Sequence, residues 1–137
     1  MVKKNIINSK NAPSAIGTYS QGISTENLIF TSGQIPINPE TNEIVSGKFE
    51  EQVNQVLYNL NEVLVAAGSN KDNLVKLTVF ITDLTNFDKL NNAFVDFFGD
   101  AYPARSVVEV SALPKGAMVE IECICIKYLN IYICFYY

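Results

Sequence analysis

The sequence contains no histidine, and this absence restricts the possible chemistry more than any other feature of its composition. Without histidine there can be no Ser-His or Cys-His nucleophile pair and no histidine-liganded metal site. The side chain that titrates nearest to neutral pH is also missing. Any acid–base catalysis must therefore use Asp, Glu, Lys, Tyr, Cys or water.

The chain also has few basic residues and no long apolar run. Its net charge of −4 and its pI of about 4.7 predict no general affinity for nucleic acid. No uninterrupted apolar stretch approaches the roughly 18 residues of a membrane span, so no membrane partner is expected. The N-terminal segment lacks the apolar region of a secretory signal.

Cysteine is scarce as well, with three residues in all. An odd number of cysteines without a secretory signal favours free thiols and a cytoplasmic location, with an organelle as the alternative. Cys123 and Cys125 are spaced as in some metal sites, but two further soft ligands are missing. We therefore expect buried thiols there and no metal.

The 137 residues suffice for one domain with one hydrophobic core. Strand patterns at 19–24 and 28–34 predict a hairpin that turns at Thr25-Glu26-Asn27. A further short strand is expected near residues 3–7. The segment 35–43, "IPINPETNE", is rich in proline and asparagine and is predicted to be a loop.

Apolar residues recur with a period of 3.6 from residue 48 to residue 67, which predicts a helix. Ser46 is a candidate cap for its start, and Gly68 stands where a left-handed terminator belongs. The nearly continuous β-branched run at 74–82 is typical of a central strand.

A second helix is predicted from a capping box, Thr85 to Asp88, to about Phe98, with Gly99 ending it. Two more strands follow at 105–110 and 118–126. The predicted order is β-β-α-β-α-β-β, an α+β fold in which two helices pack on one face of a mixed sheet.

Side chains alternate across a strand, so the last two strands each present two distinct faces. If these strands are neighbours, one face is uniformly apolar and should contact the helices; it comprises Val108, Val110, Val119, Ile121, Cys123 and Cys125. The other face mixes Arg105, Val107 and Glu109 with Glu120, Glu122, Ile124 and Ile126. A half-apolar face of this kind is typical of a subunit interface, so we expect an oligomer.

Two interpretations of Arg105 and Glu120 follow from this pattern. An arginine on a rigid strand can bind a carboxylate with two parallel hydrogen bonds, while a nearby glutamate holds a water or accepts its proton. Alternatively the two side chains pair with each other and stabilise the interface. The pattern alone favours the pairing.

Several motifs, in order, resemble the Rid family, which is also called the YjgF or L-PSP endoribonuclease family. They are "NAPSAIGTYSQGI", "IFTSGQIP", "AAGS", "VKLTVFITDLTNFDKLNNAFVDFF" and "PARSVVEVSALPKGAMVEIECI". The resemblance covers about residues 8–127, so we expect a single domain over 1–127 and an apolar extension over 128–137. Because it spans several motifs, it is more specific than a lone-motif match.

The resemblance implies a chorismate-mutase-like fold and a homotrimer, with the three sheets in a central barrel and ligand clefts between subunits. It also implies hydrolysis of reactive 2-enamine and 2-imino acids, such as 2-aminoacrylate/2-iminopropanoate and 2-iminobutanoate, to 2-keto acids and ammonia, without metal or cofactor. By the same resemblance, Arg105 binds the substrate carboxylate and Glu120 positions the attacking water. The remaining matches to the family's cleft residues are Tyr19, Ser32, Gly33 and Asn91.

One departure from the family pattern is Val107, since many members have cysteine after "PARS". The substitution removes a thiol from the expected cleft, with consequences for substrate preference or redox regulation. Two other functions stay open. Family members are also described as endoribonucleases that inhibit translation, and a non-catalytic trimer that binds a small carboxylate or acts as a chaperone would fit the same features.

Overall fold

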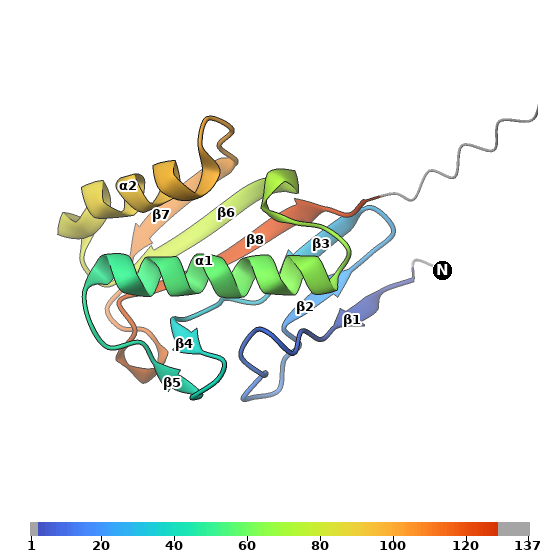
Figure 1. Ribbon diagram of the computed structural model, residues 1–137, viewed down its shortest axis with the longest axis horizontal. Helices are drawn as coiled ribbons and strands as arrows, with labels where there is room; N and C mark the ends of the chain where they lie inside the picture. The colour runs from blue at the N-terminus through green and yellow to red at the C-terminus, as the bar shows by residue number, and fades with distance from the viewer. Residues whose placement is uncertain (1–2, 129–137) are drawn as a thin grey trace, which may run out of the picture.

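Two helices pack on one face of a six-stranded mixed sheet in the computed structural model, which describes residues 3–128 (Figure 1). The strands in spatial order are β1 (Asn5–Ile7), β2 (Gly22–Ser24), β3 (Leu28–Thr31), β8 (Val119–Ile126), β6 (Leu74–Ile81) and β7 (Ala104–Glu109). The helices are α1 (Phe49–Ala66) and α2 (Phe87–Phe98). The predicted α+β fold, with both helices on the same face, is confirmed.

The first hairpin is where the sequence predicts it, although both strands are shorter. Thr25 donates its backbone N–H to the carbonyl of Leu28 at 2.8 Å and closes the turn between β2 and β3. The segment predicted as a loop instead contains a second, two-stranded sheet of β4 (Ile37–Asn38) and β5 (Glu43–Ile44). Asn42, with φ of 60°, lies in the tight turn that joins them, a conformation that asparagine tolerates.

Helix α1 ends as predicted but begins differently. Gly68 has φ of 80°, and Ser69 donates its N–H to the carbonyl of Leu64 at 2.9 Å, so the left-handed terminator is confirmed. The predicted cap by Ser46 is wrong, because Lys48 occupies the N-cap position. The Glu51 carboxylate accepts the Lys48 backbone N–H at 3.2 Å, so a side chain inside the first turn satisfies this donor.

Helix α2 also ends at the predicted glycine, Gly99, whose φ is 66°. The predicted capping box is wrong, because a short 3₁₀ turn, η2 (Leu84–Asn86), precedes the helix. Asp83 caps that turn: its carboxylate accepts the Thr85 backbone N–H at 2.9 Å and the Thr85 hydroxyl at 2.6 Å. Thr85 is therefore hydrogen-bonded within the 3₁₀ turn and does not cap α2.

The faces of the last two strands were predicted on the assumption that these strands are neighbours. In the structure they are not. Strand β6 lies between them, antiparallel to β8 and parallel to β7. Parallel strands need a long crossover, and α2 supplies it between β6 and β7. Strand β8, apolar on one face along its whole length, occupies an interior position, whereas β7 forms an edge.

This order reverses the predicted faces of β7. Val107 is paired with Val79, whose side chain is fully buried beneath the helices, and Val107 packs against the same core. Val108 points to the opposite face and is 46 % exposed. The prediction for β8 is confirmed, because its helix-facing side chains are all buried: Val119, Ile121, Cys123 and Cys125.

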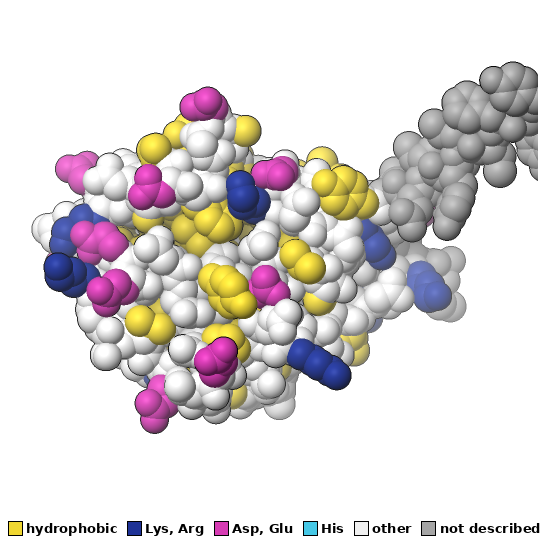
Figure 2. Space-filling model, viewed as in Figure 1, with side chains coloured by type: hydrophobic (Ala, Val, Ile, Leu, Met, Phe, Trp, Pro, Cys, Tyr) yellow, Lys and Arg dark blue, Asp and Glu magenta, His cyan; other side chains and the backbone are white. Residues whose placement is uncertain are grey.

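The face of the sheet away from the helices is covered by no other element of residues 3–128. Its exposed apolar side chains include Ile6, Leu28, Phe30, Val108 and Ile126. An uncovered apolar face of this kind is typical of an interface, and the predicted oligomer remains a prediction. On the opposite side, apolar side chains gather between α1 and α2 (Figure 2).

Within residues 3–128 there is no helix of the length and hydrophobicity needed to cross a membrane. The apolar extension predicted at 128–137 lies outside the described residues, apart from Tyr128.

Candidate functional site

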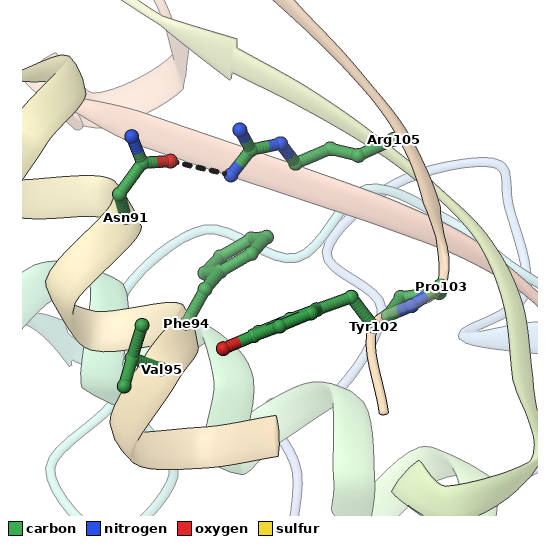
Figure 3. A pocket seen from close by; sticks show the side chains of 6 residues that line it. All are labelled: Asn91, Phe94, Val95, Tyr102, Pro103 and Arg105. Carbon is green, nitrogen blue, oxygen red and sulfur yellow. Dashed lines mark hydrogen bonds between the residues drawn. The ribbon is translucent and has the colours of Figure 1, made fainter. Parts of the chain in front are cut away.

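Arg105 lies on the edge strand β7, and its side chain points to the helix-covered face. Its strand partner is Leu77, a fully buried residue of that face. The guanidinium donates a hydrogen bond from Nη1 to the Asn91 side-chain oxygen on α2 at 2.9 Å (Figure 3). The structure therefore brings together two of the predicted site residues, Arg105 and Asn91.

Two aromatic rings and one neutral amide form the surroundings of this guanidinium. Its central carbon is 5.3 Å from the centroid of Phe87 and 5.2 Å from that of Phe94, distances typical of cation–π contacts. The ion pairs found among residues 3–128 are Lys71–Asp72 and Lys89–Glu50, and neither involves Arg105. A guanidinium has five N–H donors, so most of them are available to a ligand.

A cavity of about 480 Å³ opens beside this arginine. Asn91 and Arg105 are its polar walls, and the rest of the lining is mostly apolar: Phe94, Val95, Tyr102 and Pro103. The volume falls in the range of small-molecule sites, which combine apolar walls with a few convergent polar groups.

Glu120 lies on the opposite face of the sheet from Arg105. Its partner on β6 is Phe80, which alternates with the buried Val79 and Ile81. The half-buried Glu120 carboxylate lies against Gly33, where a Cβ atom would collide with it. Partial burial, and to a smaller extent the neighbouring Glu122, raise the pKa of Glu120.

Tyr19 and Gly33 line a second, small cavity of about 30 Å³, enough for one water molecule. Tyr19 is 47 % exposed, and its hydroxyl accepts the Ile16 backbone N–H at 3.3 Å. Ser32 donates its hydroxyl to the Ser20 carbonyl at 2.6 Å, so this proton is already bonded within the chain.

The predicted site residues therefore form two groups, and one chain does not unite them. Arg105 and Asn91 are on the helix-covered side of the sheet, and Glu120 on the other side next to Gly33. The pairing of Arg105 with Glu120, which the sequence pattern favoured, does not occur within the chain, because the two side chains leave opposite faces.

Several residues at these places were not identified from the sequence. Phe87 and Phe94 flank the predicted Asn91 along α2 at spacings of four and three, a helical signal that could have indicated an aromatic cradle for a cation. Gln21, which is 4 % exposed, accepts the Ser9 N–H at 2.6 Å and donates to the carbonyls of Ser9 and Pro13 at 3.1 and 2.7 Å. It thus holds the segment that borders Tyr19, and no pattern in the sequence indicates this.

The cysteines of β8 are buried thiols, as predicted. Burial raises the pKa of Cys123 to about 12 and also raises that of Cys125. Neither thiol is therefore suited to act as a nucleophile or metal ligand at neutral pH. No group of three or more His, Cys, Asp or Glu side chains that could hold a metal ion occurs among the described residues.

Comparison with known families gives a match over residues 9–127 to the model described as endoribonuclease L-PSP. The chain belongs to the L-PSP, or Rid, family. A solved Rid family protein from Yersinia pestis is 53 % identical, with a TM-score of 0.86 over 90 % of this chain and 98 % of that one. This Rid family chain therefore has the predicted fold.

Two further relatives of this Rid family chain carry more specific names. The 2-iminobutanoate/2-iminopropanoate deaminase of Homo sapiens is 40 % identical over 124 residues, which are 90 % of each chain. E. coli TdcF, solved with bound serine, is 42 % identical, with a TM-score of 0.87 over 90 % of this chain and 99 % of that one. Deaminase and endoribonuclease names thus both occur in the family.

Proposed function

We propose that this protein hydrolyses small 2-enamine and 2-imino acids, including 2-iminobutanoate and 2-iminopropanoate, to 2-keto acids and ammonia. The observation that carries the proposal is the Arg105 guanidinium, which is held by one amide between two aromatic rings. The 40 % identity to the human deaminase supports the same reaction class.

The surroundings of Arg105 favour a small carboxylate as its ligand. A carboxylate can accept two parallel N–H bonds from the guanidinium fork, and the neutral Asn91 amide does not satisfy that fork. The flanking rings of Phe87 and Phe94 limit the directions in which the guanidinium can turn. Arg105 is also the only arginine in the sequence, so no other side chain offers this geometry.

The group around Glu120 is suited to hold and activate water. The raised pKa of this carboxyl makes its carboxylate a stronger base than an exposed glutamate. Because Gly33 has no side chain, the Glu120 carboxylate lies directly against its backbone, and the small cavity that Gly33 and Tyr19 line can take one water.

A complete site then requires two copies of the chain. Because Arg105 and Glu120 lie on opposite faces of the sheet, we infer that Arg105 and Asn91 of one subunit meet Tyr19, Gly33 and Glu120 of another. The uncovered apolar face of the sheet supports association. A homotrimer is the assembly that the family resemblance implies. Its rotational symmetry makes all its interfaces equivalent, so each interface would carry the same site.

In the proposed mechanism, Arg105 fixes the substrate carboxylate and thereby the position of the imine carbon. Protonation of the imine nitrogen makes that carbon more electrophilic. The water held by Glu120 forms the new C–O bond while Glu120 accepts its proton. That proton then passes to the nitrogen of the tetrahedral adduct, the C–N bond breaks, and ammonia leaves as the adduct's hydroxyl returns its proton to Glu120 and becomes the keto group. Orientation and proton transfer supply the catalysis, and no cofactor is invoked.

The test is the decay of 2-iminobutanoate generated in situ, measured as ammonia release with and without the protein. The wild-type protein should accelerate the decay, and Arg105→Ala should abolish most of the acceleration. Lys89→Ala is a matched control, since it removes an exposed cation from α2 whose ion pair among residues 3–128 is with Glu50 at 3.8 Å. Normal activity of Arg105→Ala would refute the carboxylate anchor.

Mixing two inactive variants tests the two-subunit site. Arg105→Ala and Glu120→Gln proteins are unfolded together, refolded at equal amounts and assayed. If each site takes Arg105 and Glu120 from different subunits, random assembly leaves about a quarter of the sites intact, by the symmetry of the ring. If both residues serve the same site from one chain, no activity returns.

The endoribonuclease activity in the family name is tested with the same preparations. Dark blue Lys and Arg side chains are scattered among acidic ones on the helix-covered face, without a continuous basic stripe (Figure 2). Salt-sensitive cleavage of RNA by pure protein, together with no effect on imine decay, would replace the deaminase proposal by the endoribonuclease. Binding of small carboxylates without turnover would favour a sensing role.

A further inference from the structure

The cavity beside Arg105 combines an anion-binding end with an apolar wall that the proposed reaction does not use. Arg105 and Asn91 are at one end of the cavity, and the wall consists of Phe94, Val95 and Tyr102. In Figure 3 the Tyr102 ring extends towards Phe94 and Val95, while Arg105 reaches towards Asn91. A carboxylate held by Arg105 would leave this wall in contact with water.

Two residues of this apolar wall are more than half exposed. Val95 is on the outer side of α2 and is 52 % exposed, and Tyr102, in the connection to β7, is 56 % exposed. Phe94, by contrast, is buried, with 4 % exposure, and lines the cavity between these two side chains and the guanidinium. Side chains that are exposed singly need no explanation, but here two of them flank one cavity whose other end binds anions.

From this arrangement we infer that Val95 and Tyr102 form a subsite for the side chain of the substrate. The preferred substrates are then 2-imino acids with larger apolar side chains, such as those derived from norvaline, leucine or phenylalanine. The inference rests on the proposed function and goes beyond it, because it specifies the substituent on the imine carbon.

The available space and the chemistry of the wall both support this occupant. A cavity of about 480 Å³ is much larger than the ethyl side chain of 2-iminobutanoate requires. Each further methylene that leaves water for the wall should raise kcat/KM about fourfold, the value expected from transfer of a CH₂ group. The leucine-derived imine, with two more carbons, should therefore be favoured roughly 15-fold over 2-iminobutanoate. A charged or hydroxylated side chain would gain nothing from these walls.

The experiment compares kcat/KM for imines produced in situ by a flavin-dependent amino-acid oxidase from 2-aminobutyrate, norvaline, leucine and phenylalanine. The variants are Val95→Ser and Tyr102→Ala, with Val65→Ser as matched control. Val65 is an exposed helical valine, like Val95, with 51 % exposure, but it lies on α1 and does not line the cavity. The ratio of kcat/KM between two imines cancels any general loss of active protein.

The wild type and Val65→Ser should both favour the leucine-derived imine over 2-iminobutanoate by about 15-fold. Val95→Ser and Tyr102→Ala should each reduce this ratio by about fourfold or more while 2-iminobutanoate is still hydrolysed. A wild-type ratio near one, or an equal ratio in all four proteins, would overturn the subsite. The latter result would also be expected if a neighbouring subunit filled the wall.

A binding measurement separates failure of the subsite from failure of the proposed function. Calorimetric titration with the unreactive 2-oxobutanoate and 4-methyl-2-oxopentanoate should give tighter binding of the larger acid, and Val95→Ser should remove the difference. This outcome without any imine turnover would support the subsite and refute the deaminase. Turnover of 2-iminobutanoate with equal affinity for both keto acids would refute the subsite alone.

Discussion

Replacement of Arg105 is the perturbation whose effect can be worked out most fully from the structure. A hydrogen bond between charged groups contributes about 1.5–3 kcal/mol. Two such bonds to a substrate carboxylate, taken at the lower end because the arginine is half-buried, contribute about 3 kcal/mol. At 1.36 kcal/mol per tenfold change, Arg105→Ala should lower kcat/KM for 2-iminobutanoate by about 100-fold or more.

Arg105→Lys should fall between wild type and Arg105→Ala. It keeps the positive charge but loses the planar fork, so only one of the two parallel bonds can form. We expect a loss of about tenfold, chiefly through KM, because the charge still attracts the carboxylate while the orientation is looser.

Arg105→Ala should affect the stability of the protein far less than its activity. In the native chain Arg105 makes one bond to the Asn91 amide and two cation–π contacts. Together these contribute about 1–2 kcal/mol to the free energy of unfolding at a half-exposed position. Urea denaturation of Arg105→Ala measures this loss independently of the imine assay.

The reasoning is refuted if Arg105→Ala retains kcat/KM within threefold of wild type while urea denaturation shows a folded protein. Because the sequence has a single arginine, chemical modification gives a second check that needs no mutation. An arginine-specific dicarbonyl should inactivate the protein in proportion to one modified residue per chain. A bound 2-keto acid should slow that inactivation.

The other predictions concern the group around Glu120 and the segment next to Tyr19. Glu120→Gln should abolish turnover yet increase the free energy of unfolding at pH 7. Because the pKa of Glu120 is raised in the folded state, ionisation of this carboxyl destabilises the native chain. The increase in stability should therefore fade as the pH falls towards 4.5, and denaturation at several pH values measures it. Equal gains at pH 4 and pH 7 would contradict this. Gly33→Ala should lower kcat/KM about tenfold, because its methyl group displaces the Glu120 carboxylate. Gly99→Ala has open space for its methyl group but a strained backbone, with φ of 66° and ψ of −116°, and should cost about 1–3 kcal/mol of stability while leaving activity intact. Gln21→Leu should lower the free energy of unfolding by about 2–3 kcal/mol because it leaves the polar groups of Ser9 and Pro13 unpaired. Gln21→Glu should lose at least as much, because a buried carboxylate can accept the Ser9 N–H but cannot donate to the carbonyls of Ser9 and Pro13.

The elements of the fold could be predicted because their signals are local. The period of apolar residues in α1, the alternation in β8 and the terminators Gly68 and Gly99 each act within a few residues of the chain. Both helix starts were predicted wrongly because several nearby polar residues compete for the same backbone N–H groups. The carboxylates of Asp83 and Glu51 accept these N–H groups in the structure, and only the path of the incoming chain decides this.

The sequence proposes candidate site residues, whose roles remain predictions, but it does not predict their geometry. Alternation along β7 correctly separates Arg105 from Val108, but it does not say which set faces the helices. That depends on whether β7 pairs with β8 or with β6, a choice made by elements far apart in sequence. Pairing with β6 places Val107 on the core and Arg105 beneath α2, the reverse of the prediction.

The separation of Arg105 and Glu120 by the thickness of a sheet has a kinetic consequence. Under the proposed function, folding of a single chain completes the core but produces only two separate halves of the catalytic centre. If the halves meet between chains, specific activity is a function of protein concentration: it falls on dilution below the dissociation constant of the assembly and recovers with a lag after reconcentration. A newly synthesised chain would then be folded and stable, yet inert, until it found its partners.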